Sequence, residues 1–161
     1  MLSDGDTPRA LSDAELEEVD ARIDAWARRQ LEELDVVAAV ERSEGDERRW
    51  FIRVRGEAKD VFSIWLTLRQ RTLLYETYFM PAPEENAEQL YEYVLRHNLD
   101  LFGAAFCIGE EDAVFLRGHL AAEAVTDAEL DRVLGSLYAW VERFFRPMLA
   151  IGFASRFNAR S

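Results

Sequence analysis

The residues best suited to bind another molecule lie between Arg48 and Arg71, where aromatic and cationic side chains alternate. Strand alternation places Phe51, Arg53, Arg55 and Trp65 on one side of a predicted sheet, and Tyr75 of the next predicted strand is a further candidate for this side. Aromatic rings supply contact area in protein interfaces and stacking surfaces for single-stranded nucleic acids, while guanidinium groups bind carboxylates and phosphates. The pattern predicts a binding surface. Two other interpretations stay open, namely that the arginines only keep a sheet face solvated, or that a helix of the same chain covers it.

The charge distribution favours a protein or peptide as the partner over RNA. The chain carries a net charge of −12, whose field repels phosphate groups before local contacts can form. Within this acidic protein, the stretch from Arg48 to Arg71 holds seven basic residues and only Glu57 and Asp60 as acids. We therefore predict a protein or peptide partner, with no nucleic acid and no membrane among the partners, and keep an RNA-binding sheet as a second alternative.

The residues usually responsible for catalysis do not form a recognisable set. The two histidines, His97 and His119, lie in different predicted elements, so their spacing does not predict that they bind one metal ion together. The single cysteine, Cys107, belongs to the apolar run Ala104 to Ile108 and is typical of a small buried residue. The glycines are scattered and form no phosphate-binding loop. We predict a protein that is not an enzyme, with no catalytic residue, no metal and no cofactor.

The elements that position the binding residues follow from local patterns. Ser12 and Glu15 have the spacing of a capping box and predict a helix start, and Thr126 with Glu129 predicts another. Pro83 is expected in the first turn of a middle helix, and Pro147 is expected to end or kink the last one. The predicted strands are Trp50 to Arg55, Val61 to Leu68, Leu73 to Met80, and a hairpin of Ala104 to Ile108 with Ala113 to Leu116.

These elements predict an α+β fold with the order α-β-β-β-α-β-β-α and an antiparallel sheet packed with helices. Two points stay open: Val36 to Val40 fits either a helix extension or a short strand, and the third strand is apolar on both sides. The helical apolar stripes place Trp26, Leu90 and Leu137 in the core.

The chain has the length of one domain. Residues 1–10 are polar and are predicted to be disordered, residues 11–157 form the domain, and residues 158–161 form a tail. The first residues lack the basic-then-apolar pattern of an export signal, and no segment approaches the ~20 apolar residues of a membrane span. We expect a cytoplasmic protein.

Several segments resemble the YbjN-domain proteins, in particular the branch of peptide-binding chaperones related to type III secretion chaperones. The resemblance rests on RRWFIRVRGE, VFSIWLTLRQRTLLYETYFMPAPEENAEQLYEYVLRHN, AAFCIGEEDAVFLRGHL and LDRVLGSLYAWVERFFRPMLAIGF. It is most specific in TYFMPAPEEN and GSLY. It implies the same element order, a homodimer, and the holding of an extended segment of another protein. It brings no catalytic residues, and the family is sometimes described as regulating sensory transduction.

Together these observations predict a non-enzymatic protein that binds an extended peptide segment by strand addition at a sheet edge. The predicted pocket residues are Phe51, Trp65, Tyr75 and Phe79, and Arg53 and Arg55 would select the flanking residues. A regulator that binds a small ligand between helix and sheet is the first alternative. A pocket that gathers Tyr78, Tyr91 and Trp140 would favour it.

Overall fold

The computed structural model describes residues 7–158. Its elements, in chain order, are α1 (Asp13–Glu33), β1 (Val37–Arg42), β2 (Arg48–Arg55), β3 (Val61–Leu68), β4 (Thr72–Met80), α2 (Ala87–Asn98), β5 (Ala105–Ile108), η2 (Glu110–Asp112), β6 (Val114–Ala121), η3 (Ala122–Ala124), α3 (Asp127–Gly152) and α4 (Ala154–Asn158). The predicted α+β class is therefore confirmed, and the predicted order is extended by β1 and α4.

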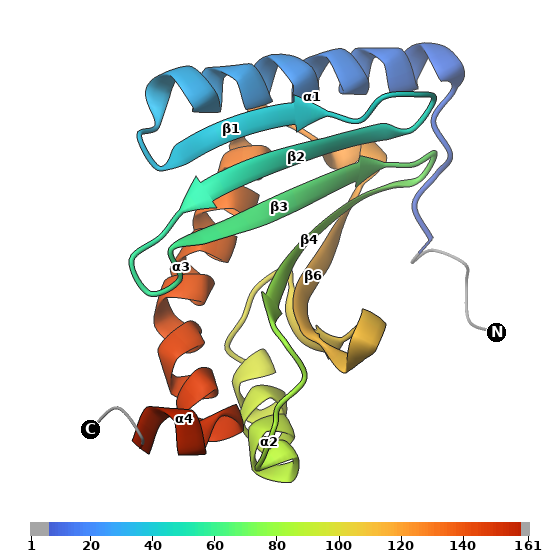
Figure 1. Ribbon diagram of the computed structural model, residues 1–161. Coiled ribbons are helices and arrows are strands. Elements are labelled where there is room, and N and C mark those ends of the chain that lie inside the picture. Colours follow the sequence, from blue (N-terminus) through green and yellow to red (C-terminus); the bar gives the residue numbers. More distant parts are fainter. Residues whose placement is uncertain (1–6, 159–161) are drawn as a thin grey trace, which may run out of the picture.

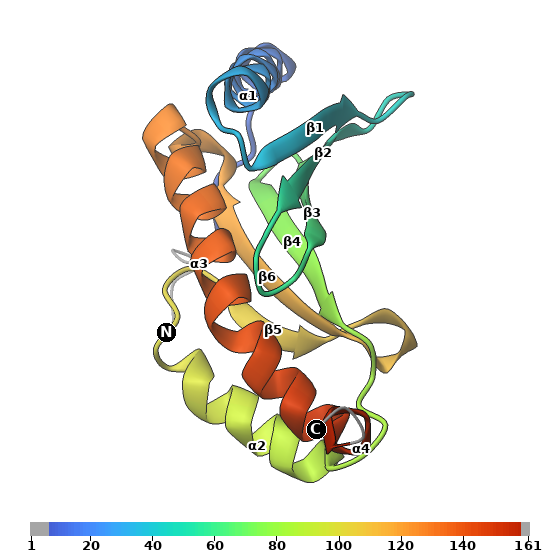
Figure 2. The same ribbon diagram turned by 60° about the vertical axis from the view of Figure 1, so that its left-hand side comes forward.

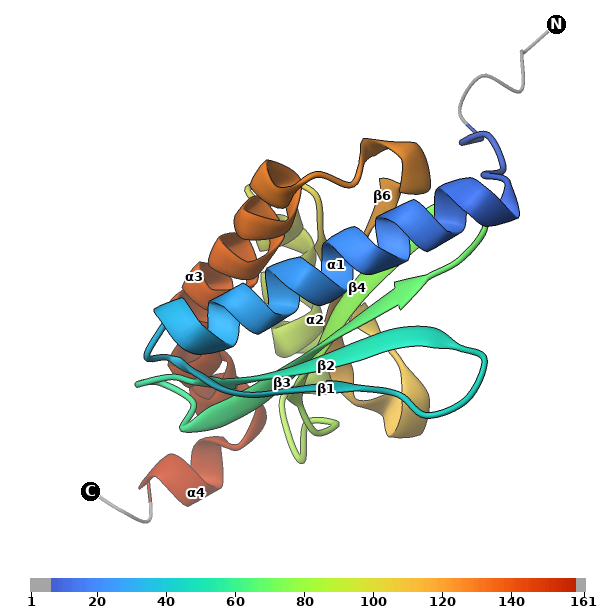
Figure 3. The ribbon, with the colours of Figure 1, turned by 90° about the horizontal axis from the view of Figure 1, so that it is seen from above.

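One six-stranded sheet has the spatial order β1-β2-β3-β4-β6-β5, and every neighbouring pair is antiparallel. Helix α3 passes behind β2 and β3 (Figure 1), and α2 lies on the same side of the sheet as α3 (Figure 2). We call this helix-covered side the inner face and the opposite side the outer face. Helix α1 runs along the β1 end of the sheet and approaches α3 with its C-terminal part (Figure 3).

The start of α1 follows the predicted capping box. The Ser12 hydroxyl accepts a hydrogen bond from the Glu15 amide at 3.2 Å, and the Glu15 carboxylate accepts one from the Ser12 amide at 3.1 Å. Two tryptophans then fix α1 on the fold. Trp26 Nε1 donates to Asp131 of α3 at 2.8 Å, and Trp50 Nε1 of β2 donates to Asp24 of α1 at 3.2 Å.

Ion pairs also connect α1 to the first hairpin. The buried carboxylate of Asp20 accepts hydrogen bonds from Arg42 at 2.7 Å and from Arg48 at 2.5 Å. Hydrogen bonds from these arginines, that of Arg42 above all, lower the pKa of Asp20 against the opposing effect of its burial. The carboxylate therefore stays ionised where it joins the helix to both strands.

The segment that the sequence left open, Val36 to Val40, forms most of β1 and does not prolong the helix. Helix α1 ends at Glu33, and the Leu34 cap has an extended backbone. Val37 is only 4% exposed and pairs with Val54, with a register shift before Ala39. Pairing with β2 satisfies backbone groups and buries valines that pack well in strands, so the strand replaces another helical turn.

Of the two expectations that rested on proline, the helix start at Pro83 was wrong, and Pro147 does not end the last helix. Helix α2 begins at Ala87 and not at Pro83, because Asn86 between them has a left-handed backbone with φ 55°, which interrupts a right-handed helix. The amides of Glu84 and Glu85, which precede it, donate to the Gly152 carbonyl at 2.9 and 3.1 Å. Helix α3 continues through Pro147 to Gly152. Pro147 lies on the exposed side, and the buried residues that follow it, Met148 and Gly152, keep the last turns on the core.

The core lies between the inner face and the helices. It contains the three residues predicted from the helical stripes, with exposed fractions of 1% for Trp26 and 0% for Leu90 and Leu137. Of the segment predicted to be disordered, residues 1–6 lie outside the described residues. The next residues contact the domain: Arg71 donates to the Pro8 carbonyl at 2.6 Å, and Arg9 pairs with Glu15 and Glu123. In the predicted tail, residues 159–161 also lie outside the description.

Candidate functional site

The outer face of the sheet carries the aromatic and cationic residues that the sequence singled out. Within residues 7–158, no α-helix lies on this face, whereas α2 and α3 cover the inner one (Figures 1 and 2). The interpretation that a helix of the described chain hides the surface is therefore wrong.

One aromatic pair joins β2 to β3. Phe51 and Trp65 are register partners, and their rings pack edge to face with centroids 5.5 Å apart. The guanidinium of Arg49 lies 4.4 Å from the Trp65 ring centroid and 5.3 Å from that of Phe51. Both aromatic side chains are half-buried, and Arg53 beside them is exposed. The group offers apolar area and positive charge at the same place.

A second aromatic pair joins β4 to β6. Tyr78 and Phe115 are also register partners with edge-to-face rings, 5.5 Å apart. Arg117 lies 4.6 Å from the Phe115 ring, and the Lys59 ammonium lies 5.1 Å from the Tyr78 ring. Tyr78 is 43% exposed, which leaves much of its ring open to a partner. The two pairs repeat the same arrangement of aromatic rings and cations.

Between the two pairs lies a buried carboxylate. Glu76 is 8% exposed, pairs in register with both Trp65 and Arg117, and accepts a hydrogen bond from Arg117 Nε at 2.5 Å. Its other oxygen lies 4.0 Å from Arg49. Glu76 thus compensates part of the charge of these two arginines, while Arg53 takes part in no ion pair within the described residues.

A pocket of about 310 Å³ opens beside Glu76. It is lined by Arg53, Lys59, Val61, Phe62, Ser63, Trp65, Glu76, Tyr78 and Phe115. A smaller hollow of about 100 Å³, lined by Ala39, Glu41, Phe51, Arg53 and Ser63, shares Arg53 and Ser63 with it. The two hollows therefore adjoin across β2 and β3 and offer places for successive side chains of one bound segment.

Lys59 is one of the residues that line this pocket. Its ammonium donates to the carbonyls of Tyr78 and Phe79 at 3.1 and 2.9 Å. Burial lowers the pKa of Lys59 to about 8, because an ammonium removed from water loses solvation. The side chain is fixed by backbone carbonyls, so it shapes the wall of the pocket and adds positive charge to it.

The structure brings together some of the predicted site residues and separates others. Phe51, Arg53 and Trp65 are neighbours on the outer face. Arg55 lies at the end of β2, where it is exposed and donates to the Asp35 carbonyl at 3.2 Å. Tyr75 and Phe79 lie instead in the core, 2% and 0% exposed, and Tyr75 pairs with Leu66 of the inner face. They cannot offer a surface to a partner.

Sequence reasoning missed four residues of the outer face: Lys59, Tyr78, Phe115 and Arg117. Alternation in β4 was uninformative because both of its sides are apolar. Glu76 was the usable signal, because a lone acid between apolar residues pairs best with a cation, and Tyr78 is on the same side of the strand. Arg117 and Phe115 could be placed only after the β4–β6 pairing was known.

The two edges of the sheet differ. At the β5 edge, the Asn98 side chain accepts a hydrogen bond from the Phe106 amide at 2.7 Å and donates to the Phe106 carbonyl at 3.2 Å. These outward groups are therefore already paired. At the β1 edge, the Ser43 amide donates to the Arg49 carbonyl, so in the antiparallel ladder Val40 and Arg42 direct their backbone groups away from β2.

The described residues give little support to other classes of site. No group of three or more His, Cys, Asp or Glu residues among positions 7–158 has a geometry suited to a metal ion. None of the helices in that range combines the length and apolarity needed to cross a membrane. Tyr78 and Tyr91 line two different pockets, so the gathered aromatic pocket that would favour a small-ligand regulator is not formed.

Comparison with known proteins places these features in context. The model of the family YbjN, described as "Putative bacterial sensory transduction regulator", matches residues 20–150. The uncharacterized protein Rv0487 of Mycobacterium tuberculosis is 32% identical over 104 residues, which are 65% of this chain and 57% of the relative. The uncharacterized protein ML2442 of Mycobacterium leprae is 28% identical over 107 residues, 66% of this chain and 58% of the relative. The chain thus spans less than two thirds of the length of these curated relatives.

Solved structures with the same fold include a chain of the HopA1-SchA chaperone-effector complex, with a TM-score of 0.57 and 16% identity, covering 85% of this chain and 99% of that one. The ExsC-ExsE complex gives a TM-score of 0.55 at 16% identity, covering 79% and 93%. The heterodimeric complex ExoU-SpcU from the type III secretion system of Pseudomonas aeruginosa gives 0.53 at 13% identity, covering 78% and 96%. At this identity the likeness establishes the fold.

Proposed function

Because the chain belongs to the YbjN family, and its fold is that of chains in chaperone-effector complexes, we propose that it is a non-enzymatic chaperone-like binding protein. It holds an extended segment of a partner protein in the cytoplasm, either to protect the partner or to regulate it. The observation that carries the proposal is the outer face. Two aromatic pairs with adjacent cations line adjoining hollows on a side of the sheet that no described α-helix covers.

The chemistry of this face defines the segment that it would hold. Aromatic and aliphatic side chains of the partner would enter the hollows beside Trp65 and Tyr78, where they bury apolar area. Acidic side chains of the partner would reach the exposed Arg53 and Arg55. The preferred segment is therefore acidic and aromatic, although the protein itself is acidic overall.

Strand addition at the β1 edge would fix the register of this segment. The outward backbone groups of Val40 and Arg42 would pair with an extended chain. The β1 edge is preferred for this pairing because, at the other edge, Asn98 already occupies the outward groups of Phe106. Main-chain hydrogen bonds would then supply affinity that does not depend on sequence. The hollow beside Phe51 and the adjoining one beside Trp65 would supply the selectivity.

The test of this proposal is peptide binding to the variant Trp65→Glu. We expect the wild-type protein to bind acidic, aromatic peptides on an array, and the variant to bind them at least about tenfold more weakly, as for loss of an aromatic anchor. Circular dichroism should show unchanged helical content, because Trp65 is half-buried on the outer face. The matched control is Leu31→Glu, a substitution at an exposed position on α1. This variant should bind the same peptides with the affinity of the wild type.

Two results would contradict the proposal. The first is a wild-type protein that binds none of the acidic, aromatic peptides in a fluorescence anisotropy titration. The second is a folded Trp65→Glu variant with wild-type affinity, which would move the site away from the outer face.

We further propose that the protein forms a homodimer. Four large apolar residues are exposed on or near α2 and β5, namely Leu95, Leu99, Phe102 and Ile108, with Leu99 exposed to 90%. Such a group is unusual for a monomer and is suited to a second copy of the chain.

Sedimentation analysis tests the dimer. We expect a dimer for the wild type, and for Leu99→Glu a dimer dissociation constant raised by about tenfold or more, because a buried carboxylate at the interface would be unpaired. The outer-face control Arg53→Glu should sediment like the wild type. A monomeric wild type at micromolar concentration would refute the dimer without affecting the outer face.

A further inference from the structure

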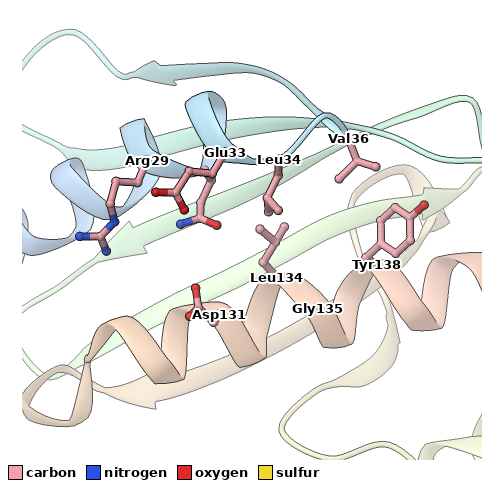
Figure 4. Close-up of a pocket in the computed structure, with 9 residues that line it drawn as sticks. Arg29, Glu33, Leu34, Val36, Asp131, Leu134, Gly135 and Tyr138 are labelled. Carbon is pink, nitrogen blue, oxygen red and sulfur yellow. The ribbon is translucent and has the colours of Figure 1, made fainter.

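Another hollow lies away from the outer face, between the C-terminal half of α1 and the N-terminal half of α3 (Figure 4). It has a volume of about 470 Å³ and is lined by Arg29, Gln30, Glu33, Leu34, Val36, Asp131, Leu134, Gly135 and Tyr138. Leu34 and Leu134 point toward one another across it, and Tyr138 closes the end near β1 (Figure 4). We call this hollow the α1–α3 cleft.

Gly135 is the informative residue of the α1–α3 cleft. It lies in the interior of the 26-residue helix α3, where glycine weakens a helix relative to alanine. A Cβ atom built at Gly135 would meet nothing within 4 Å, and its φ is not in the left-handed region. Neither the packing nor the backbone of this chain therefore requires glycine at this position. A bare helical backbone facing an open cleft allows the close approach of another molecule.

The charged residues around the α1–α3 cleft indicate the charge that its occupant should carry. Arg29 is already paired with Asp127 at 2.8 Å, so its charge is compensated. Glu33 and Asp131 line the cleft, and Asp131 uses one oxygen to accept from Trp26. The last turn of α1 contains no basic residue, so its carbonyl ends add further negative potential. The cleft favours a cation, in contrast to the arginine-bearing outer face.

From these observations we propose that the α1–α3 cleft docks an amphipathic, basic helix of the partner protein. Its apolar side chains lie between Leu34 and Tyr138, its backbone approaches Gly135, and a lysine or arginine reaches Glu33 and Asp131. This inference rests on the proposed binding of a partner protein but uses a separate surface. The partner would then carry two unlike segments, an acidic, aromatic one for the sheet and a basic, apolar one for the cleft.

The experiment uses a designed amphipathic peptide of about fifteen residues with leucines at i, i+4 and i+7 and lysines flanking this stripe. Isotope-labelled full-length protein is titrated with it and followed by NMR. We expect chemical-shift changes at the amides of Gly135, Leu34 and Tyr138. A matched peptide with glutamate in place of lysine should bind at least about tenfold more weakly, because it meets like charges at Glu33 and Asp131.

Two variants sharpen the test. Gly135→Ala should raise the midpoint of thermal unfolding, because alanine favours the helix. The same variant should bind the lysine-bearing peptide more weakly than the wild type does. Gly135→Met fills more of the cleft and should lower the affinity for the lysine-bearing peptide by at least about tenfold. A stabilised Gly135→Ala protein with reduced binding separates the role of this glycine from any role in folding.

Failure of this inference is distinguishable from failure of the proposed function. Gly135→Met should leave the binding of acidic, aromatic peptides unchanged, and Trp65→Glu should leave the lysine peptide unchanged. The inference is refuted if the lysine peptide causes no shift at Gly135, or if the lysine and glutamate peptides bind equally. Neither result affects the proposed function of the outer face, which is tested separately by the binding of acidic, aromatic peptides.

Discussion

Replacing Leu90 with alanine is expected to lower the free energy of unfolding by roughly 2 to 5 kcal/mol. Leu90 lies in α2 with an exposed fraction of 0%, and its side chain is one of those nearest to Gly152 of α3. Truncation removes buried methyl groups and leaves a cavity where α2, α3 and the end of β4 meet. Chemical denaturation followed by circular dichroism measures the loss.

The control for this prediction is the same substitution at an exposed leucine. Leu31 in α1 is 43% exposed, so Leu31→Ala should change the unfolding free energy by much less, about 1 kcal/mol at most. Equal midpoints for Leu90→Ala and the wild type would show that α2 does not pack on the core as described.

The second large effect is expected at a glycine in β6. Gly118 pairs with Tyr75 of β4, and an added Cβ atom would lie 2.0 Å from the Gly103 carbonyl oxygen and 2.5 Å from the Tyr75 ring. Tyr75 in turn donates its hydroxyl to the Gly103 carbonyl. Gly118→Ala must therefore displace both a backbone segment and a buried ring. We expect it to lower the free energy of unfolding by about 3 kcal/mol or more.

Gly135→Ala is the matched control, because the same methyl group added there meets nothing within 4 Å. Thermal unfolding of the two variants should therefore give midpoints that move in opposite directions, down for Gly118→Ala and up for Gly135→Ala. If Gly118→Ala unfolds at the wild-type midpoint, the loop that carries Gly103 does not rest on β6.

The sequence predicted well those features that depend on neighbouring residues. The capping box of Ser12 and Glu15 set the start of α1, and alternation in β2 and β3 separated the face of Trp65 from the core. Features that depend on distant residues were predicted less well. Pro83 has a favourable spacing for a helix start, yet Asn86 has a left-handed backbone and α2 begins only after it. The amides of Glu84 and Glu85 pair instead with the Gly152 carbonyl, far along the chain.

The candidate site shows the same division. Phe51, Arg53 and Trp65 belong to two consecutive strands, so their shared face follows from alternation and a single turn. Tyr75 and Phe79 were misplaced because β4 is covered on one side by helices and is partly buried on the other, which removes the polar positions that reveal a face. Phe115 and Arg117 join the site only because β6 lies next to β4, a pairing between residues about forty positions apart.

The hydrogen bonds of Asn98 to Phe106 have a consequence for solubility at high concentration. Sheets with two open edges can stack from molecule to molecule and grow into fibres, and natural proteins avoid this by protecting their edges. Here α2 supplies a side-chain amide that stands in for the next strand at Phe106 of β5, so a strand added at this edge would have to displace Asn98. A protein that accepts a foreign strand at β1 is therefore protected at its opposite edge from pairing with the β5 strand of a second molecule.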